Sequence, residues 1–238
     1  MRKILITNDD GIDSEGLVRL AEAATEFGEV WVVAPDGQRS AMSHCATFNK
    51  EITVWPVDFP VDNVKAFACD GKPADCARVG ILNIVPGRPD FVFSGINYGY
   101  NISHDLQYSG TAGAAFEAAF FKVQAIAFSE DIGHNHEVTD YYLKEIISKL
   151  IEIPLSDKQV HNVNFPGCSM AECKGILFDT KVSNDNFYED TYAESSTTDG
   201  KKKYSVITKR NTENVTEGTD LKAVLDNYVS VGIITNIS

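Results

Sequence analysis

The stretch Arg2-Lys3-Ile4-Leu5-Ile6-Thr7-Asn8-Asp9-Asp10-Gly11 places an apolar run directly before an acidic turn. The run from Ile4 to Ile6 predicts a buried strand, and the Asn-Asp-Asp-Gly sequence that follows is typical of a turn. In open α/β sheets, ligands bind outside the carboxyl ends of the strands. Asp9 and Asp10 therefore stand where a ligand is expected.

Two adjacent carboxylates repel each other, and a raised pKa in one of them or a bound cation would relieve the repulsion. A hard divalent cation suits oxygen ligands, and Mg²⁺ commonly takes one or two carboxylates together with phosphate. An Asp-Asp-Gly sequence also occurs as a plain solvated turn, and that interpretation stays open at this point. Its place after the first strand favours the metal site.

A strand, a helix and a second strand follow one another within the first 35 residues. Ser14 is the expected N-cap of the helix, apolar residues follow it at helical spacing, and Gly28 stands where the helix would end. Residues 29–34 predict the second strand, which Pro35 stops. This unit predicts parallel strands with a right-handed crossover. Its first turn lacks the glycine fingerprint of dinucleotide sites, which argues against a Rossmann cofactor.

The remaining chain continues to alternate strands and helices, which predicts an α/β fold with a mostly parallel sheet and flanking helices. Strands are expected at 52–57 and 64–68 (a side hairpin), 90–94, 124–129, 160–166, 176–182, 204–208 and 228–234. Helices are expected at 74–84, 112–122, 138–151 and 220–226. His134 and His136 lie in a polar linker and are expected to face solvent.

Residues 184–203 are polar and rich in Ser, Thr, Asp and Glu, which predicts an exposed arm or a mobile loop. No repeat and no interdomain linker is apparent. We therefore expect one domain over residues 1–238, with a core at about 1–182 and a protruding arm and C-terminal segment at about 183–238.

Composition narrows the class of protein. The chain has 238 residues, and its 43% hydrophobic and 23% charged residues are typical of a globular protein. No apolar run reaches the length of a membrane span, and we expect no signal peptide before the first strand. Five cysteines without a Cys-x-x-Cys pair indicate reduced thiols. We therefore expect a cytoplasmic protein without a membrane partner.

The formal net charge of −13 argues against a protein that binds long nucleic acid, because neutralising phosphates requires clustered Lys and Arg. A small phosphorylated substrate remains compatible with this charge, since a bound metal ion reverses the local charge.

Two further loops carry candidate site residues. Hydroxyls of Ser40 or Ser43 are candidate metal ligands, and Arg39 is a candidate phosphate contact. The turn Ser109-Gly110-Thr111 offers amides, hydroxyls and the favourable end of a helix dipole to an anion. It is equally compatible with a plain N-cap.

Taken together, these stretches resemble the SurE family, the survival-protein nucleotidases. The motifs that carry the resemblance are Thr7–Gly11, Ala34-Pro35 followed by Arg39-Ser40, Asp70–Cys76, Ser94–Asn101 and Tyr108–Ala115, with Asn162–Pro166 and Gly218–Asp220 as further landmarks. The resemblance is strong to about residue 130 and thinner afterwards. Ala41 stands where the family often has Gly, a small change that should leave the Ser40 ligand in place. The family's last strand usually runs into a Thr-Pro-Leu segment, whereas 229–234 end this chain nearly at once, which leaves base preference and subunit exchange open.

The resemblance implies a Rossmann-like α/β fold with a C-terminal β-rich extension, and metal-dependent hydrolysis of nucleoside 5′- and 3′-monophosphates, with short polyphosphate as a further substrate. Carried over by motif, the metal ligands would be Asp9, Asp10, Ser40 and Asn97. All four are oxygen donors, which suits one Mg²⁺ or Mn²⁺ per subunit rather than zinc. The family also implies a homodimer or homotetramer.

Within this hypothesis, Asp9 and Asp10 are the catalytic residues. The expected phosphate-binding residues are Gly95, Asn101, Ser109, Gly110 and Thr111. Two alternatives remain open: a nucleotide sensor without turnover, and a phosphatase in which Asp9 is a covalent nucleophile.

Overall fold

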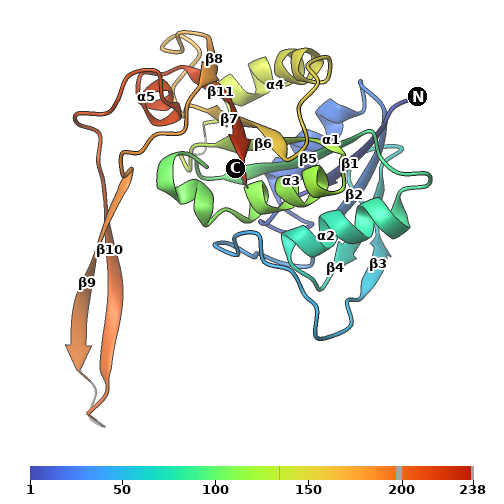
Figure 1. Ribbon diagram of the computed structural model, residues 1–238, viewed down its shortest axis with the longest axis horizontal. Helices are drawn as coiled ribbons and strands as arrows, with labels where there is room; N and C mark the ends of the chain where they lie inside the picture. Colours follow the sequence, from blue (N-terminus) through green and yellow to red (C-terminus); the bar gives the residue numbers. More distant parts are fainter. Residues whose placement is uncertain (134, 197–199, 237–238) are drawn as a thin grey trace.

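A nine-stranded sheet runs through the body of the computed structural model, which describes residues 1–133, 135–196 and 200–236 (Figure 1). Its order is β3-β4-β2-β1-β5-β6-β7-β11-β8, and β9 and β10 form a separate pair. The strands are β1 (Lys3–Thr7), β2 (Glu29–Pro35), β3 (Val54–Val57), β4 (Lys65–Cys69), β5 (Phe91–Tyr98), β6 (Gln124–Glu130), β7 (Gln159–Phe165), β8 (Ile176–Thr180), β9 (Tyr188–Ser196), β10 (Lys202–Arg210) and β11 (Val229–Thr235).

The six consecutive strands from β4 to β7 are parallel to one another. β3 is antiparallel to β4, β11 is antiparallel to β7, and β8 is parallel to β11. The predicted α/β fold with a mostly parallel sheet is therefore confirmed. The expected side hairpin exists, but it is the edge of the main sheet because β4 pairs directly with β2.

Alternation along each central strand supplies both faces of the sheet. Ile4 and Ile6 belong to one buried cluster, whereas Leu5 belongs to the other. Helices α1 and α4 cover the first face, and α2 and α3 cover the second (Figure 1). The helices are α1 (Glu15–Ala24), α2 (Pro73–Val79), α3 (Gly110–Phe120), α4 (Glu137–Leu150) and α5 (Asp220–Leu225).

Two predicted helices have different bounds in the structure. The helix expected at 74–84 is α2 followed by a π-helical turn, Gly80–Ile84. A Cβ on Gly80 would lie 2.5 Å from a methyl group of Leu5, so the chain passes close to β1 at this point. The helix expected at 112–122 begins two residues earlier, because Ser109 is its N-cap and accepts a hydrogen bond from the Ala112 amide at 2.9 Å.

The polar segment after residue 184 forms the antiparallel hairpin β9–β10, which projects from the body (Figure 1). Its residues are mostly exposed, as predicted for an arm, but it is more regular than a loop. Cross-strand side chains stabilise it: Thr208 donates to Asp190 at 2.7 Å and Tyr204 donates to Glu194 at 2.9 Å. The expectation of a single domain stays a prediction.

Among the described residues, no helix is both long enough and apolar enough to cross a membrane.

Candidate functional site

The acidic turn after β1 is shaped by its own Asn and Gly. Asn8 donates from Nδ2 to the Gly11 carbonyl at 3.0 Å, and it accepts from the Gly11 amide at 3.2 Å. Gly11 has a φ of +104°, and the Gly37 backbone lies 3.1 Å from where its Cβ would stand. Only glycine meets both conditions. Ser14 is at the predicted N-cap, but its hydroxyl accepts from Asn8 rather than from the helix.

Asp9 is buried against the start of α3. Only 4% of the residue is exposed, and its Oδ1 accepts a hydrogen bond from the Thr111 hydroxyl. A Cβ on Gly110 would lie 2.9 Å from the Asp9 Cβ, so glycine allows the helix to approach this closely. Burial raises the pKa of Asp9 to about 6, an effect that the Thr111 hydrogen bond opposes and the neighbouring Asp10 charge reinforces.

Asp10 is less buried and faces the end of β5. Its Oδ2 accepts from the Tyr98 amide at 3.1 Å. Burial raises the pKa of Asp10, while hydrogen bonds from Tyr98 and Gln38 lower it. The β5–β6 pairing shifts register between Ser94 and Asn97, an irregularity that re-aims side chains at strand ends.

The other two predicted ligands lie beside residues that contact the acidic pair. Asn97 precedes Tyr98 and donates from Nδ2 to the Gly99 carbonyl at 2.6 Å, which leaves its Oδ1 for another partner. Ser40 is exposed and follows Arg39, whose amide donates to the Asp9 carbonyl at 2.6 Å. Ser40 and Asn97 are thus sequence neighbours of residues whose amides bond to Asp9 and Asp10, and their role as metal ligands stays a prediction.

The donor set fits a divalent cation. Two carboxylates, one carboxamide oxygen and one hydroxyl are hard oxygen ligands. Within the described ranges neither Asp9 nor Asp10 takes part in an ion pair with Lys, Arg or His. Both carboxylates have raised pKa values because burial is not offset by a positive charge. A bound cation would supply that charge.

Both hydroxyls of the expected phosphate-binding turn already take part in hydrogen bonds within the protein. The Thr111 hydroxyl hydrogen goes to Asp9, so Thr111 positions a carboxylate and is not the helix cap. Ser109 is the cap, as an acceptor, and its own hydroxyl hydrogen remains available. Phosphate binding by Ser109, Gly110 and Thr111 stays a prediction.

Asn101 and Gly95 lie inside the framework. Asn101 donates from Nδ2 to the Ser129 hydroxyl at 2.7 Å, and its backbone amide donates to Asn164 at 2.8 Å. A Cβ on Gly95 would lie 2.3 Å from the Phe128 carbonyl, so glycine allows β5 and β6 to approach closely. These contacts explain both residues as supports of the sheet, and their phosphate role stays a prediction.

Sequence reasoning missed a buried carboxylate at the end of β6. Glu130 is 3% exposed, is paired with Arg19, and lines a cavity of about 220 Å³ beside Asp10. The expectation that His136 faces solvent was wrong: its side chain is 20% exposed and its Nδ1 lies 3.0 Å from Glu130. His134 lies outside the described residues. The signal was Glu130 itself, one residue beyond the strand predicted at 124–129 and thus at the same sheet edge as Asp9.

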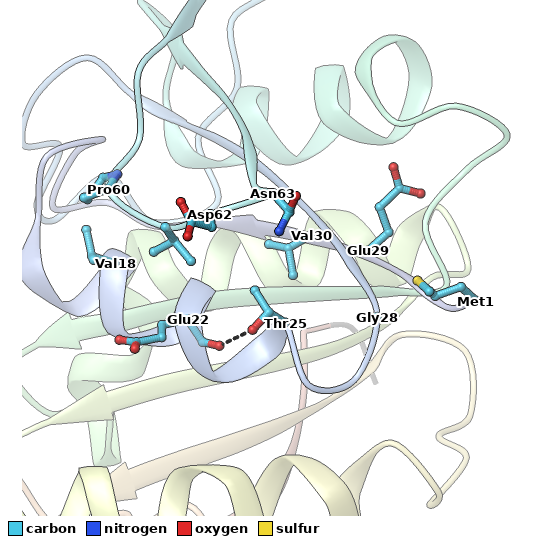
Figure 2. A pocket seen from close by; sticks show the side chains of 11 residues that line it. Met1, Val18, Glu22, Thr25, Gly28, Glu29, Val30, Pro60, Asp62 and Asn63 are labelled. Carbon is cyan, nitrogen blue, oxygen red and sulfur yellow. Dashed lines mark hydrogen bonds between the residues drawn. The ribbon is translucent and has the colours of Figure 1, made fainter.

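A second cavity, of about 670 Å³, lies at the opposite edge of the sheet. Figure 2 shows Met1, Glu29 and Asn63 around it, with Thr25 bonded to the Glu22 carbonyl. Met1 and Glu29 stand at the amino ends of β1 and β2. This cavity is therefore separate from the acidic turn.

Comparison with known proteins gives consistent matches. The family model described as "Survival protein SurE" matches residues 4–188. A "5'-nucleotidase SurE" of Clostridium botulinum (strain ATCC 19397 / Type A) is 38% identical over 232 residues, 96% of this chain and 90% of the relative. One of Thermoanaerobacter pseudethanolicus is 36% identical over 231 residues, with the same coverage. A crystal structure titled as the Sure protein from Aquifex aeolicus has a TM-score of 0.85 and 32% identity, covering 99% of this chain and 94% of that one.

Asp9→Asn is expected to stabilise the metal-free protein above pH 6. The folded state holds the Asp9 proton up to a pKa of about 6, compared with 3.8 for an ordinary Asp, so the parent loses stability as the pH rises through this window. The loss is on the order of 3 kcal/mol, at about 1.36 kcal/mol per pH unit, and Asn avoids it. Urea unfolding in chelator from pH 4 to pH 8 measures the difference.

The control for this experiment is Asp13→Asn, which removes an exposed carboxylate from the same loop. The stability of that variant should follow the parent across the whole range. A constant difference between Asp9→Asn and the parent from pH 4 to pH 8 would contradict the prediction.

Proposed function

The chain belongs to the SurE family, and from this premise we propose that it is a metal-dependent phosphomonoesterase that hydrolyses nucleoside 5′-monophosphates to nucleoside and phosphate. The observation that carries the proposal is the buried Asp9 carboxylate, held by Thr111 at the start of α3 and without a cationic partner in the described ranges. Nucleoside 3′-monophosphates and short polyphosphate belong to the same proposal, because they present the same terminal phosphate.

One Mg²⁺ or Mn²⁺ per subunit would be held by Asp9, Asp10, Ser40 and Asn97. When bound, the cation would neutralise phosphate charge and activate water as a Lewis acid. The carboxylates are held in place for this role from two sides: the Thr111 hydroxyl fixes Asp9, and the Tyr98 amide fixes Asp10.

The remaining chemistry of phosphoryl transfer is positioning and charge stabilisation. The N-terminus of α3 points the positive end of its dipole at the acidic turn, which favours a phosphate there. Water adds to phosphorus as the ester P–O bond breaks. One carboxylate of the Asp9–Asp10 pair takes the proton from the water and passes it to the ester oxygen, which leaves as the nucleoside hydroxyl.

Direct attack by Asp9 is the less favoured chemistry. Its carboxylate is buried, bonded to Thr111 and crowded by Gly110, whereas a nucleophile must reach phosphorus. Activation of water needs only that the carboxylate lies near the water.

The proposed setting is the cytoplasm. All five cysteines are free, including the exposed Cys45 and the partly buried Cys168 and Cys173. The net charge of −13 supports a small phosphorylated substrate over long nucleic acid.

Phosphate release from AMP and GMP is expected with Mn²⁺ or Mg²⁺, to stop with excess chelator, and to return when Mn²⁺ is added back. The reason is that the two adjacent carboxylates of Asp9 and Asp10 repel a phosphate unless a cation offsets their charge. A colorimetric phosphate assay measures this, and labelled phosphate should not remain on the protein. Full turnover after exhaustive chelation would refute the metal role, and nucleotide binding without release would support the sensor alternative.

Thr111→Ala is expected to lower kcat/KM about tenfold, equivalent to about 1.36 kcal/mol of transition-state stabilisation. The acid limb of the pH profile should also move to higher pH, because the Thr111 hydrogen bond lowers the pKa of Asp9. Thr111→Ser keeps the hydroxyl and should resemble the parent. Steady-state kinetics measured about every half pH unit, from about pH 4.5 to about pH 9, determine both effects.

Ser109→Ala is the matched control for Thr111→Ala. It removes the cap of the same helix at a cost of about 1 kcal/mol of stability, so it should melt earlier without moving the acid limb. If Thr111→Ala had the same kcat/KM and the same pH profile as the parent, the hydroxyl would have only a structural role.

The chain is expected to assemble at least as a dimer through the β9–β10 hairpin. Tyr192 and Val206 face each other across the hairpin and are 66% and 56% exposed, which is unusual for apolar side chains on a projecting arm. Light scattering at micromolar concentration should show a dimer or tetramer. The double variant Tyr192→Ser with Val206→Ser should be smaller, while the control Lys209→Gln should keep the parent size. A monomeric parent would contradict this expectation.

A further inference from the structure

The cavity of about 220 Å³ beside Asp10 has a buried carboxylate in its wall. Its lining includes Asp10 at the end of β1, Ile96 on β5, and Glu130 at the end of β6. The Glu130 side chain is 4% exposed. A volume below the roughly 300 Å³ of small-ligand pockets suits one part of a ligand rather than a whole nucleotide.

The two oxygens of Glu130 differ in their partners. Arg19 donates to Oε1 at 2.7 Å, and His136 Nδ1 lies 3.0 Å from the same oxygen. Oε2 is buried and accepts no hydrogen bond within the described ranges. A buried carboxylate oxygen without a donor is costly. Because Glu130 lines the cavity, a ligand bound there could supply the donor that this oxygen lacks.

Other groups around Glu130 keep its carboxylate in place. The β6 backbone holds it beside β5, where the Gly99 amide donates to the Glu130 carbonyl at 2.9 Å. Arg19 lies on α1 and also bonds to Asp140 on α4. The Glu130 carboxylate is therefore held through Arg19 and through its own backbone, and a fixed acceptor is the condition for selective recognition of a donor.

We propose that this cavity is a ribose subsite in which Glu130 Oε2 accepts hydrogen bonds from the vicinal hydroxyls of a ribonucleotide. The inference rests on the proposed nucleotidase function, which places the phosphate at Asp9 and Asp10. A hydroxyl of the sugar supplies the donor that Oε2 lacks, and a ribose is attached directly to the phosphate bound next to the cavity. The subsite makes the enzyme prefer ribonucleotides to 2′-deoxyribonucleotides.

The test compares Glu130→Gln with the parent on AMP, 2′-deoxy-AMP and p-nitrophenyl phosphate, which has no sugar. The parent should favour AMP over 2′-deoxy-AMP by about tenfold in kcat/KM, as expected for a hydrogen bond to a charged group. Glu130→Gln should lose most of this preference through a fall on AMP. Its turnover of p-nitrophenyl phosphate should stay within about twofold of the parent, since the sugar contact is absent there.

Asp140→Asn is the matched control, because it removes the other carboxylate that binds Arg19 without touching the cavity. It should keep the preference for AMP. The subsite would be overturned, and Glu130 would have only a structural role, if kcat/KM of Glu130→Gln fell equally on all three substrates. A loss of the preference for AMP in Asp140→Asn as well would lead to the same conclusion. An equal fall on both nucleotides alone would place Glu130 on another part of the nucleoside and overturn the ribose assignment.

Failure of the proposed function has a different signature. A parent that releases no phosphate from any of the three compounds refutes the nucleotidase proposal. Calorimetric titration of the parent and Glu130→Gln with AMP and 2′-deoxy-AMP then decides the subsite. Tighter binding of AMP by the parent, lost in Glu130→Gln, supports it, and equal binding of the two nucleotides by the parent overturns it.

Discussion

The hydrogen bond from the Thr111 hydroxyl to the buried Asp9 carboxylate joins the acidic turn after β1 to the start of α3. It requires the start of α3 to lie against the turn after β1, which glycine at position 110 permits. β1 and β5 are neighbours in the sheet, and α3 follows β5 in the chain. The contact between this hydroxyl and this carboxylate therefore links the central strand order to the start of α3.

The sequence predicted well what depends on local pattern. The apolar run before Asp9 and the alternation of strands with helices were sufficient for the parallel sheet, because period and breakers act over a few residues. The bounds of α3 were two residues late because the Ala-rich run dominated the pattern, whereas the cap at Ser109 fixes the true start. The regular hairpin at 188–210 was underestimated because its stabilising pairs lie across strands and not along them.

The candidate site was predictable only in part, since motifs identify residues and not the partners of their atoms. Asp9 and Asp10 could be recognised from their place after a strand. The commitment of the Thr111 hydroxyl to Asp9 and of the Asn101 amide to Ser129 depends on contacts between distant segments. Glu130 was overlooked for the same reason: its significance comes largely from Arg19, which reaches it from α1, far away in the chain.

Neighbouring positive charge distinguishes Glu130 from the pair formed by Asp9 and Asp10. Glu130 has Arg19 beside it, so one of its oxygens is neutralised by the protein and the other can bind a neutral donor. Asp9 and Asp10 have no such partner in the described ranges, and burial keeps their pKa values raised. An anionic phosphate is repelled by such a pair, and a cation is attracted by it. Under the proposed function, binding of metal and of phosphate at this edge would therefore be mutually reinforcing, and by thermodynamic linkage each would tighten the other by the same factor.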